Sequence, residues 1–183
     1  MMAGGAGIGG MEILAAELLK LNEDFQLVTL AGRNRELLAA LEGIAMEHQG
    51  KLFPIGFSSE VERIMAVADL VITKPGGLTT SECLAMGLPM IIVSPIPGQE
   101  ERNADFLLEN GAALKAHDGA ALTWRINRLL KEPKLLRRLA KHAAALGNPF
   151  AARTILETVL GEGAPPSGPP PGHQGIHFPQ EKK

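Results

Sequence analysis

Apolar and polar positions along this 183-residue chain follow two alternating periods. Short runs of β-branched and other apolar residues, typical of buried strands, are each followed by a longer segment in which apolar residues recur every three or four positions, as in an amphipathic helix. Strands that alternate with helices pair in parallel, so the pattern predicts an α/β fold: a Rossmann-like parallel sheet with helices on both faces.

The predicted strands are QLVTLAG (26–32), KLFPIGF (51–57), DLVITK (69–74) and PMIIVS (89–94). The first helix is indicated by Met11, Leu14, Leu18 and Leu21 at helical spacing. Later helices are expected at 34–45, 59–67, 79–87, 100–110, 119–131, 134–146 and 149–160. Ligands of a doubly wound sheet bind outside the carboxyl ends of its strands, so we expect the loops that follow positions 3, 31, 55, 73 and 94 to gather at one edge.

The two ends of the chain differ from the periodic middle. Residues 161–183 are crowded with Gly and Pro and lack an apolar period, which predicts a disordered tail and leaves residues 1–160 as one domain. A phosphate-binding glycine turn normally follows a buried strand, yet only three residues precede the turn here. We interpret those residues as the end of a strand and expect the chain to be part of a longer protein.

Composition narrows the classes of partner. The net charge of −2 and the 4% content of aromatic residues do not favour nucleic acid as a partner. The single cysteine, Cys83, leaves no disulfide within the chain, and we interpret it as a small buried residue. The histidines are scattered, so no metal site is predicted. No segment has the length of a membrane-spanning helix or the pattern of a signal peptide.

The first candidate for chemistry is the stretch GAGIGG, which contains Gly5, Ala6 and Gly7 and fits the spacing G-x-G-x-x-G. Such a turn presents backbone N–H groups to an anion at a helix N-terminus. A dinucleotide site also needs an acidic residue at the end of the second strand, where this chain has Arg33. An arginine there suits a 2′-phosphate, so an NADP-binding oxidoreductase domain remains an alternative.

The second candidate is ITKPGGLTTSECLAMGLP (72–89), which predicts a buried strand, a Pro-Gly-Gly turn and a helix. Gly76 and Gly77 let a ligand approach the backbone, and the N–H groups of Leu78 and Thr79 lie at the positive end of the helix. Two glycine turns at one sheet edge suit a diphosphate better than a single phosphate.

Glu82 has two interpretations. With Thr79 it fits a capping box, in which the carboxylate binds the N-cap amide and only starts the helix. Alternatively, a carboxylate one turn beyond a phosphate-binding helix start is placed to accept two hydrogen bonds from a ribose. The residues alone leave both interpretations open.

The loop and helix start SPIPGQEERNADFLLENG (94–111) present several polar groups at a strand's carboxyl end. We interpret Gln99 and Glu100 as groups that read sugar hydroxyls, which need both donors and acceptors. Glu101 and Arg102 fit the solvated first turn of a helix. Farther along, KLLRRLAKHAAAL (134–146) is basic and amphipathic, which is typical either of contact with an anionic membrane surface or of a solvated helix face.

Taken together, these stretches resemble the C-terminal half of monogalactosyldiacylglycerol synthases and processive diacylglycerol glucosyltransferases. That group is similar in turn to the MurG-type peptidoglycan N-acetylglucosaminyltransferases, which are GT-B glycosyltransferases. The resemblance covers about residues 1–160 and rests most on KPGGLTTSE (74–82) and PIPGQEERNA (95–104), a pair specific to the lipid enzymes.

The resemblance implies one half of a GT-B fold that binds a UDP-sugar, UDP-galactose or UDP-glucose, without a cofactor or a metal. It implies inverting transfer to a lipid acceptor such as diacylglycerol, which a separate N-terminal domain holds while supplying the base. The chain alone is then expected to bind donor but turn over little or none. The implied location is cytoplasmic and peripheral to a membrane, in a plant the plastid envelope. A non-catalytic nucleotide-sugar-binding regulatory module is a further alternative.

The resemblance also implies residue roles. The catalytic base stays unidentified, and Ala6 replaces a serine of the related peptidoglycan enzyme in the glycine loop. The expected donor contacts are uracil at Phe57 and Ser58, diphosphate at Gly5, Ala6, Gly7, Gly76, Gly77, Leu78 and Thr79, ribose at Glu82, and sugar at Gln99 and Glu100, with Arg33 and Lys74 also at the site.

Overall fold

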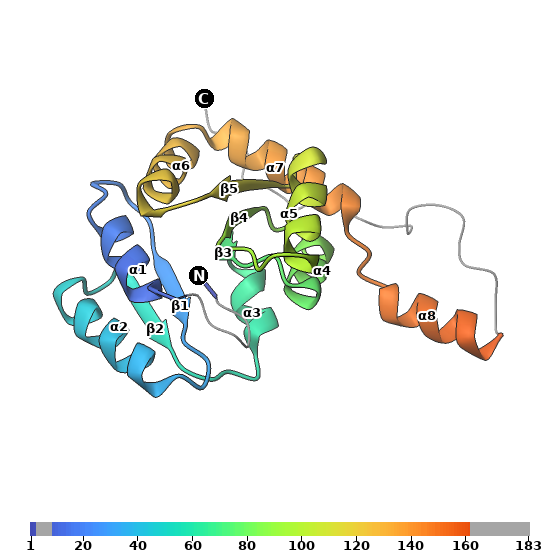
Figure 1. Ribbon diagram of the computed structural model, residues 1–183, viewed down its shortest axis with the longest axis horizontal. Helices are drawn as coiled ribbons and strands as arrows, with labels where there is room; N and C mark the ends of the chain where they lie inside the picture. Colours follow the sequence, from blue (N-terminus) through green and yellow to red (C-terminus); the bar gives the residue numbers. More distant parts are fainter. Residues whose placement is uncertain (3–8, 162–183) are drawn as a thin grey trace, which may run out of the picture. The chain divides into compact units, whose positions relative to one another are not determined.

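The computed structural model describes residues 1–2 and 9–161, and the chain divides into two compact units, residues 1–149 and 150–183. In the first unit parallel strands alternate with helices, which confirms the predicted Rossmann-like α/β fold (Figure 1). The domain boundary predicted at residue 160 stays a prediction, because the expected tail beyond Gly161 lies outside the described residues.

The strands are short and pair in parallel. Their bounds are β1 (Leu27–Leu30), β2 (Leu52–Ile55), β3 (Val71–Thr73), β4 (Met90–Val93) and β5 (Ala113–Ala116). β1 pairs with β2, and β4 pairs with both β3 and β5. Between the two groups lie the first two residues: the Met2 amide donates to Ile72 O at 3.0 Å, and the Leu30 amide donates to Met1 O at 2.9 Å. The first two residues thus bridge to β1 and β3 as a strand would, while the third residue of the predicted strand end lies outside the described residues.

The register of the strands aligns their carboxyl ends along one edge of the sheet. Met2 bridges to both Leu30 and Thr73, the last residues of β1 and β3. Leu30 lies beside Ile55 at the end of β2, and Thr73 lies beside Ile92 in β4. The loops that follow these strands consequently share one edge of the sheet, as a doubly wound fold requires of its ligand site.

All the predicted helices are present. In the first unit they are α1 (Met11–Leu19), α2 (Arg35–Glu47), α3 (Val61–Ala66), α4 (Gly77–Ala85), α5 (Gln99–Glu109), α6 (Gly119–Lys131) and α7 (Pro133–Leu146). Their ends differ from the prediction by a few residues, and α6 has the predicted bounds. The strand that the sequence did not predict is β5, whose residues ALKA include types that are rare in strands and which forms by pairing with β4.

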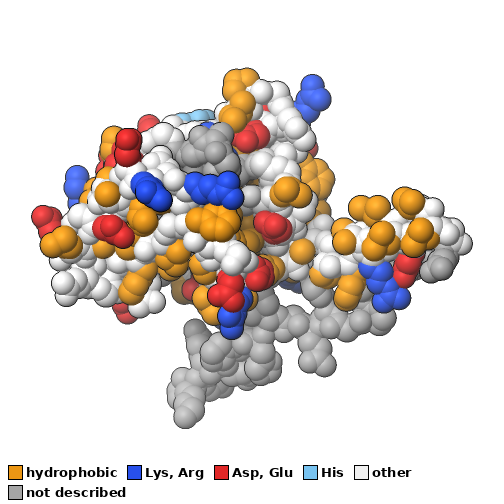
Figure 2. All heavy atoms as spheres, turned by 90° about the horizontal axis from the view of Figure 1, so that it is seen from below, with side chains coloured by type: hydrophobic (Ala, Val, Ile, Leu, Met, Phe, Trp, Pro, Cys, Tyr) orange, Lys and Arg blue, Asp and Glu red, His pale blue; other side chains and the backbone are white. Residues whose placement is uncertain are grey.

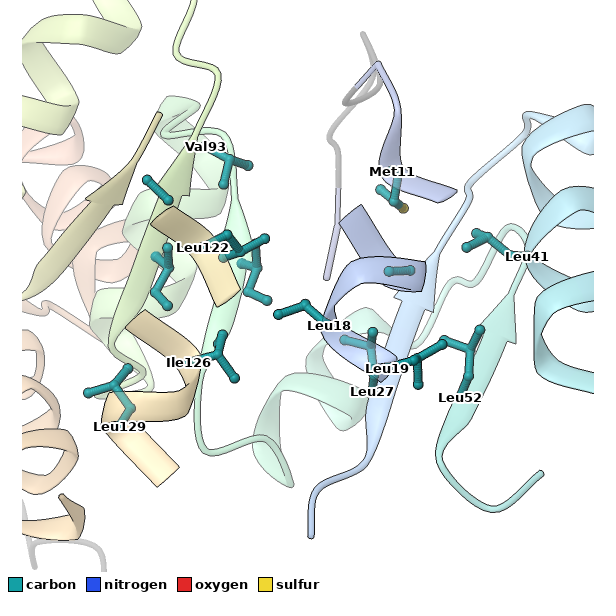
Figure 3. Packing of buried hydrophobic residues seen from close by; sticks show 14 of the residues in the cluster. Met11, Leu18, Leu19, Leu27, Leu41, Leu52, Val93, Leu122, Ile126 and Leu129 are labelled. Atoms are coloured by element: carbon teal, nitrogen blue, oxygen red, sulfur yellow. The ribbon is translucent and has the colours of Figure 1, made fainter. Parts of the chain in front are cut away.

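The core lies on both faces of the sheet. In β4 every residue is buried, and successive side chains enter different hydrophobic clusters: Met90 and Ile92 on one face, Ile91 and Val93 on the other. Figure 3 shows part of the second of these clusters, in which Leu18 of α1 points towards the side chains of α6. The prediction that helices cover both faces is confirmed, because each cluster takes buried residues from several helices.

The second unit contributes one described helix, α8 (Ala151–Leu160). It buries none of its residues, and hydrophobic side chains are spread over its surface (Figure 2). Ile155, Leu156, Val159 and Leu160 are all more than half exposed. Because the spacing of these residues places them on one side of the helix, α8 is amphipathic.

Candidate functional site

The start of α4 is open to an external anion. Gly76 is its N-cap, in an extended conformation, and the helix closes its first turn with the Thr80 amide donating to Gly76 O at 2.9 Å. Within the described part of the chain, the amides of Gly77, Leu78 and Thr79 have no acceptor. The first turn also carries no acidic residue, so nothing in it opposes the positive end of the helix.

The start of α5 is different, because its own carboxylates occupy it. Glu101 accepts a hydrogen bond from the Gly98 amide at 3.2 Å, and Glu100 accepts one from the Ile96 amide at 2.7 Å. The expectation that Glu101 belongs to an acid-rich first turn is confirmed. Of these two neighbouring helix starts, α4 is therefore the one that suits an added anion such as a phosphate.

The capping-box interpretation of Glu82 is wrong. The helix begins at Gly77, two residues before the predicted start, so Glu82 lies in its second turn, beyond the position from which a capping-box glutamate binds the N-cap amide. Glu82 is exposed, and it follows Leu78 and Thr79 by four and three residues, which puts it on the same side of the helix. Among the described residues its side chain has no hydrogen-bond or ion-pair partner, so the carboxylate is available beside the open helix start.

Two residues of α5 connect it to the turn before α4. The side-chain amide of Asn103 donates to Pro75 O at 2.9 Å. A Cβ placed on Gly76 would lie 3.9 Å from Glu100 Oε1, so this carboxylate lies beside the glycine turn. The structure thus brings Glu100 to the predicted diphosphate turn, with the exposed Gln99 preceding it in α5. Sequence reasoning gave Asn103 no role, although the motif PIPGQEERNA contained it.

The loops after β1 and β2 meet through Arg33 and Phe57. The guanidinium carbon of Arg33 lies 5.0 Å from the centre of the Phe57 ring, a cation–π contact between two exposed side chains. In the same loop the hydroxyl of Ser58 accepts a hydrogen bond from the Glu60 amide at 3.0 Å, immediately before α3. These three predicted site residues therefore lie together at the carboxyl edge of the sheet.

Lys74 contributes to the glycine turn through its backbone. Its carbonyl accepts hydrogen bonds from the Gly76 amide at 2.9 Å and from the Thr73 hydroxyl at 3.0 Å, while its side chain is half-buried. The remaining predicted donor contacts, Gly5, Ala6 and Gly7, lie outside the described residues.

The single cysteine of the chain lies in the core and not at the sheet edge. Cys83 is fully buried, as expected, and burial together with the charge of Glu82 raises the pKa of its thiol to about 12. In the part of the chain that the structure describes, no three His, Cys, Asp or Glu side chains are grouped as metal ligands. None of the described helices has the length and hydrophobicity needed to cross a bilayer.

A parallel sheet with an open helix start and a free carboxylate at its carboxyl edge defines a Rossmann-like α/β domain with a candidate anion site. Residues 12–145 match the family model of the glycosyl transferases group 1, and the chain belongs to this family. A processive diacylglycerol β-glucosyltransferase of Bacillus licheniformis is 33% identical over 160 residues, which are 87% of this chain and 42% of the relative. The resemblance inferred from the motifs is thereby confirmed. The chain spans less than half the length of this relative.

Solved structures share the fold at lower identity. MurG of Acinetobacter baumannii superposes with a TM-score of 0.67 at 20% identity, covering 87% of this chain and 49% of that one. The UDP-GlcNAc 2-epimerase of Neisseria meningitidis, solved with UDP-GlcNAc bound, gives a TM-score of 0.66 at 16% identity, with 87% and 43% covered. These likenesses agree with the expected half of a GT-B fold.

Proposed function

We propose that this chain is the donor-binding half of a glycosyltransferase that moves a hexose from a UDP-sugar to a lipid acceptor such as diacylglycerol. The observation that carries the proposal is the open start of α4, whose three free amides lie next to the unpaired carboxylate of Glu82. The name of the Bacillus relative supports both the transfer reaction and the lipid acceptor.

In this proposal each part of the donor has its own contacts. The amides of Gly77, Leu78 and Thr79 bind the diphosphate, for which the absence of a Cβ at Gly76 and Gly77 leaves room. The Glu82 carboxylate accepts hydrogen bonds from the ribose hydroxyls. The remaining contacts are uracil at Phe57 and Ser58 and hexose at Gln99 and Glu100.

The proposed reaction is an inverting, metal-independent transfer. The bond between the sugar C1 and the β-phosphate oxygen breaks, and its electron pair stays on UDP as negative charge. The amides at the start of α4 stabilise that charge while the acceptor oxygen bonds to C1 from the opposite side. The acceptor proton must pass to a base. We assign that base and the acceptor site to a further domain, so the 183-residue chain binds donor with little or no turnover.

UDP-glucose is the proposed donor rather than UDP-galactose, because the Bacillus relative is named a glucosyltransferase. The fold alone does not select the reaction, since the Neisseria protein with the same fold is named an epimerase. For the same reason, the proposal of a lipid acceptor is supported by the name of the Bacillus relative and not by the fold. A lipid acceptor places the protein at a membrane, on the cytoplasmic side where UDP-sugars are supplied.

Calorimetric titration of the 183-residue chain with UDP, UDP-glucose, UDP-galactose and NADPH tests the proposal. We expect UDP and UDP-glucose to bind and NADPH not to bind. NADPH binding without UDP binding would overturn the donor site and favour the oxidoreductase alternative that Arg33 allows. Tighter binding of UDP-galactose would overturn only the choice of hexose. Donor binding without transfer to diacylglycerol by a chain that includes an acceptor domain would favour a regulatory module.

A further inference from the structure

Positive charge is concentrated in α6 and α7. Residues 119–146 contain Glu132 as their one acidic residue, in a chain whose net charge is −2. The two helices are neighbours that follow each other at the end of the sheet domain (Figure 1). The basic residues of this segment are Arg125, Arg128, Lys131, Lys134, Arg137, Arg138 and Lys141.

The cations of α7 have no counter-charge among the described residues. The helix buries Leu135, Leu139, Ala140 and Ala143, so its basic residues lie on the side facing away from the core. Lys134, Arg137, Arg138 and Lys141 make no ion pair with any described carboxylate. Like charges gathered on one helix face repel each other, and an anionic partner relieves that repulsion.

On α6 the outward face carries Trp124, the only tryptophan of the chain. Its side chain is exposed, on the side opposite the buried Leu122 and Ile126. The guanidinium carbons of Arg125 and Arg128 lie 5.8 and 5.6 Å from its ring centre. An indole ring flanked by arginines suits the boundary between water and lipid, where the ring enters the headgroup layer and the cations meet phosphate.

We infer that the outer faces of α6 and α7, defined by Trp124 and the basic residues of 119–146, dock the protein onto a bilayer containing anionic phospholipid. The charge complements such a surface, and the tryptophan gives the contact an interfacial anchor. Nucleic acid fits less well, because the chain as a whole is acidic and the surface offers one aromatic ring for stacking. The inference rests on the proposed function in one respect: a lipid acceptor requires the enzyme to work at a bilayer.

The test is co-sedimentation of the 183-residue chain with phosphatidylcholine vesicles that contain or lack phosphatidylglycerol. We expect binding only to the anionic vesicles and weakening by salt, because the attraction is electrostatic. Trp124 reports the contact directly, and its emission should shift to the blue on binding. Absence of binding to the anionic vesicles, equal binding to both kinds, or an unshifted emission would overturn the inference.

A pair of charge-reversal variants locates the surface. Lys134→Glu with Arg138→Glu should lower the partition onto anionic vesicles by roughly 25-fold or more, because each lysine or arginine at the lipid surface strengthens binding about fivefold. Lys20→Glu with Arg35→Glu changes the net charge equally at two exposed positions, the C-cap of α1 and the first residue of α2, and should leave partition nearly unchanged. Equal weakening in both variants, or preference of the surface for a single-stranded oligonucleotide over the vesicles, would contradict the assignment.

Titration of the same α7 variant with UDP-glucose separates this inference from the proposed function. Lys134 and Arg138 are exposed and neither is a proposed donor contact, so donor affinity should match that of the unaltered chain. If the chain binds anionic vesicles through α7 but binds no UDP-sugar, the docking surface is supported and the proposed donor site is contradicted. If it binds UDP-glucose but no vesicle, the donor site is supported and the docking surface is contradicted.

Discussion

The side-chain amide of Asn103 holds the carbonyl of Pro75, with 2.9 Å between Nδ2 and O. The bond joins α5 to the turn before α4, across 28 residues of sequence. Glu100, one turn earlier in α5, lies beside Gly76 in the same turn. This bond holds the segment proposed to bind the sugar against the turn proposed to bind the diphosphate, and we propose Asn103 as a positioning residue for the donor site.

Replacing Asn103 by alanine should lower the affinity for UDP and for UDP-glucose by about five- to tenfold, the value of one hydrogen bond that fixes the turn. Calorimetric titration measures it. The control is Asn110→Ala, which removes a similar side-chain bond to Phe106 O (2.8 Å) at the far end of the same helix. An equal decrease of affinity in both variants would assign the effect to α5 stability instead of to the turn.

Gly77→Ala should separate stability from binding. A Cβ on Gly77 meets nothing within 4 Å, and the residue is helical, so alanine should raise the free energy of unfolding by about 0.5–1 kcal/mol. The same methyl group should weaken UDP binding, because it occupies the approach to the free amides. The control is Gly43→Ala in α2, which is equally open and should stabilise the chain without changing affinity. Unchanged UDP binding by the Gly77 variant would exclude the diphosphate from this turn.

Glu82→Gln should weaken UDP and UDP-glucose by the same factor, about tenfold or more, because a carboxylate–ribose contact is common to both ligands. Glu100→Gln should weaken UDP-glucose more than UDP, since its proposed contact is the hexose. Titration of each variant with both ligands gives the comparison. If Glu82→Gln affects only UDP-glucose, the ribose assignment is wrong.

Cys83 should be unreactive in the folded protein. Burial and the Glu82 charge raise its pKa to about 12, so at pH 8 only about one thiol in ten thousand is ionised. Labelling with a disulfide reagent should therefore follow the rate of unfolding, whereas the chain in denaturant should react as fast as glutathione. Rapid labelling of the native chain would show that the α4 side of the core opens without global unfolding.

In the 183-residue chain taken by itself, the Met1 amino group should make stability depend on pH. Burial lowers its pKa from 8.0 to about 5, so between these values the unfolded chain binds a proton that the folded chain does not. The group's effect is therefore to make stability rise with pH across this window, by up to about 4 kcal/mol. Urea unfolding of the free and the Nα-acetylated 183-residue chain at pH 5 and pH 8 isolates this contribution. Parallel pH profiles for the two forms would contradict the prediction.

Local chemistry determined much of the structure. Strand and helix periods predicted β1 to β4 and every helix, since burial of one or both faces imposes those periods on the sequence. Parallel pairing brings the carboxyl ends of the strands to one edge of the sheet. For this reason the sequence alone was enough to predict that Arg33, Phe57 and Gly76 lie at that edge. The burial of Cys83 was predicted because the cysteine falls within a helix and has no histidine near it in the sequence.

Tertiary structure decided the rest, because the deciding interactions join residues far apart in sequence. β5 exists through its pairing with β4, against the preferences of its own residues. Whether Glu82 capped α4 depended on where the helix began, and the extended Gly76 moved that start to Gly77. The hydrogen bond from Asn103 to the Pro75 carbonyl joins the starts of two helices, and no local sequence pattern predicts that these starts lie side by side. The motifs by themselves predicted the glycosyltransferase family, and the packed chain showed which of their groups remain free to meet a ligand.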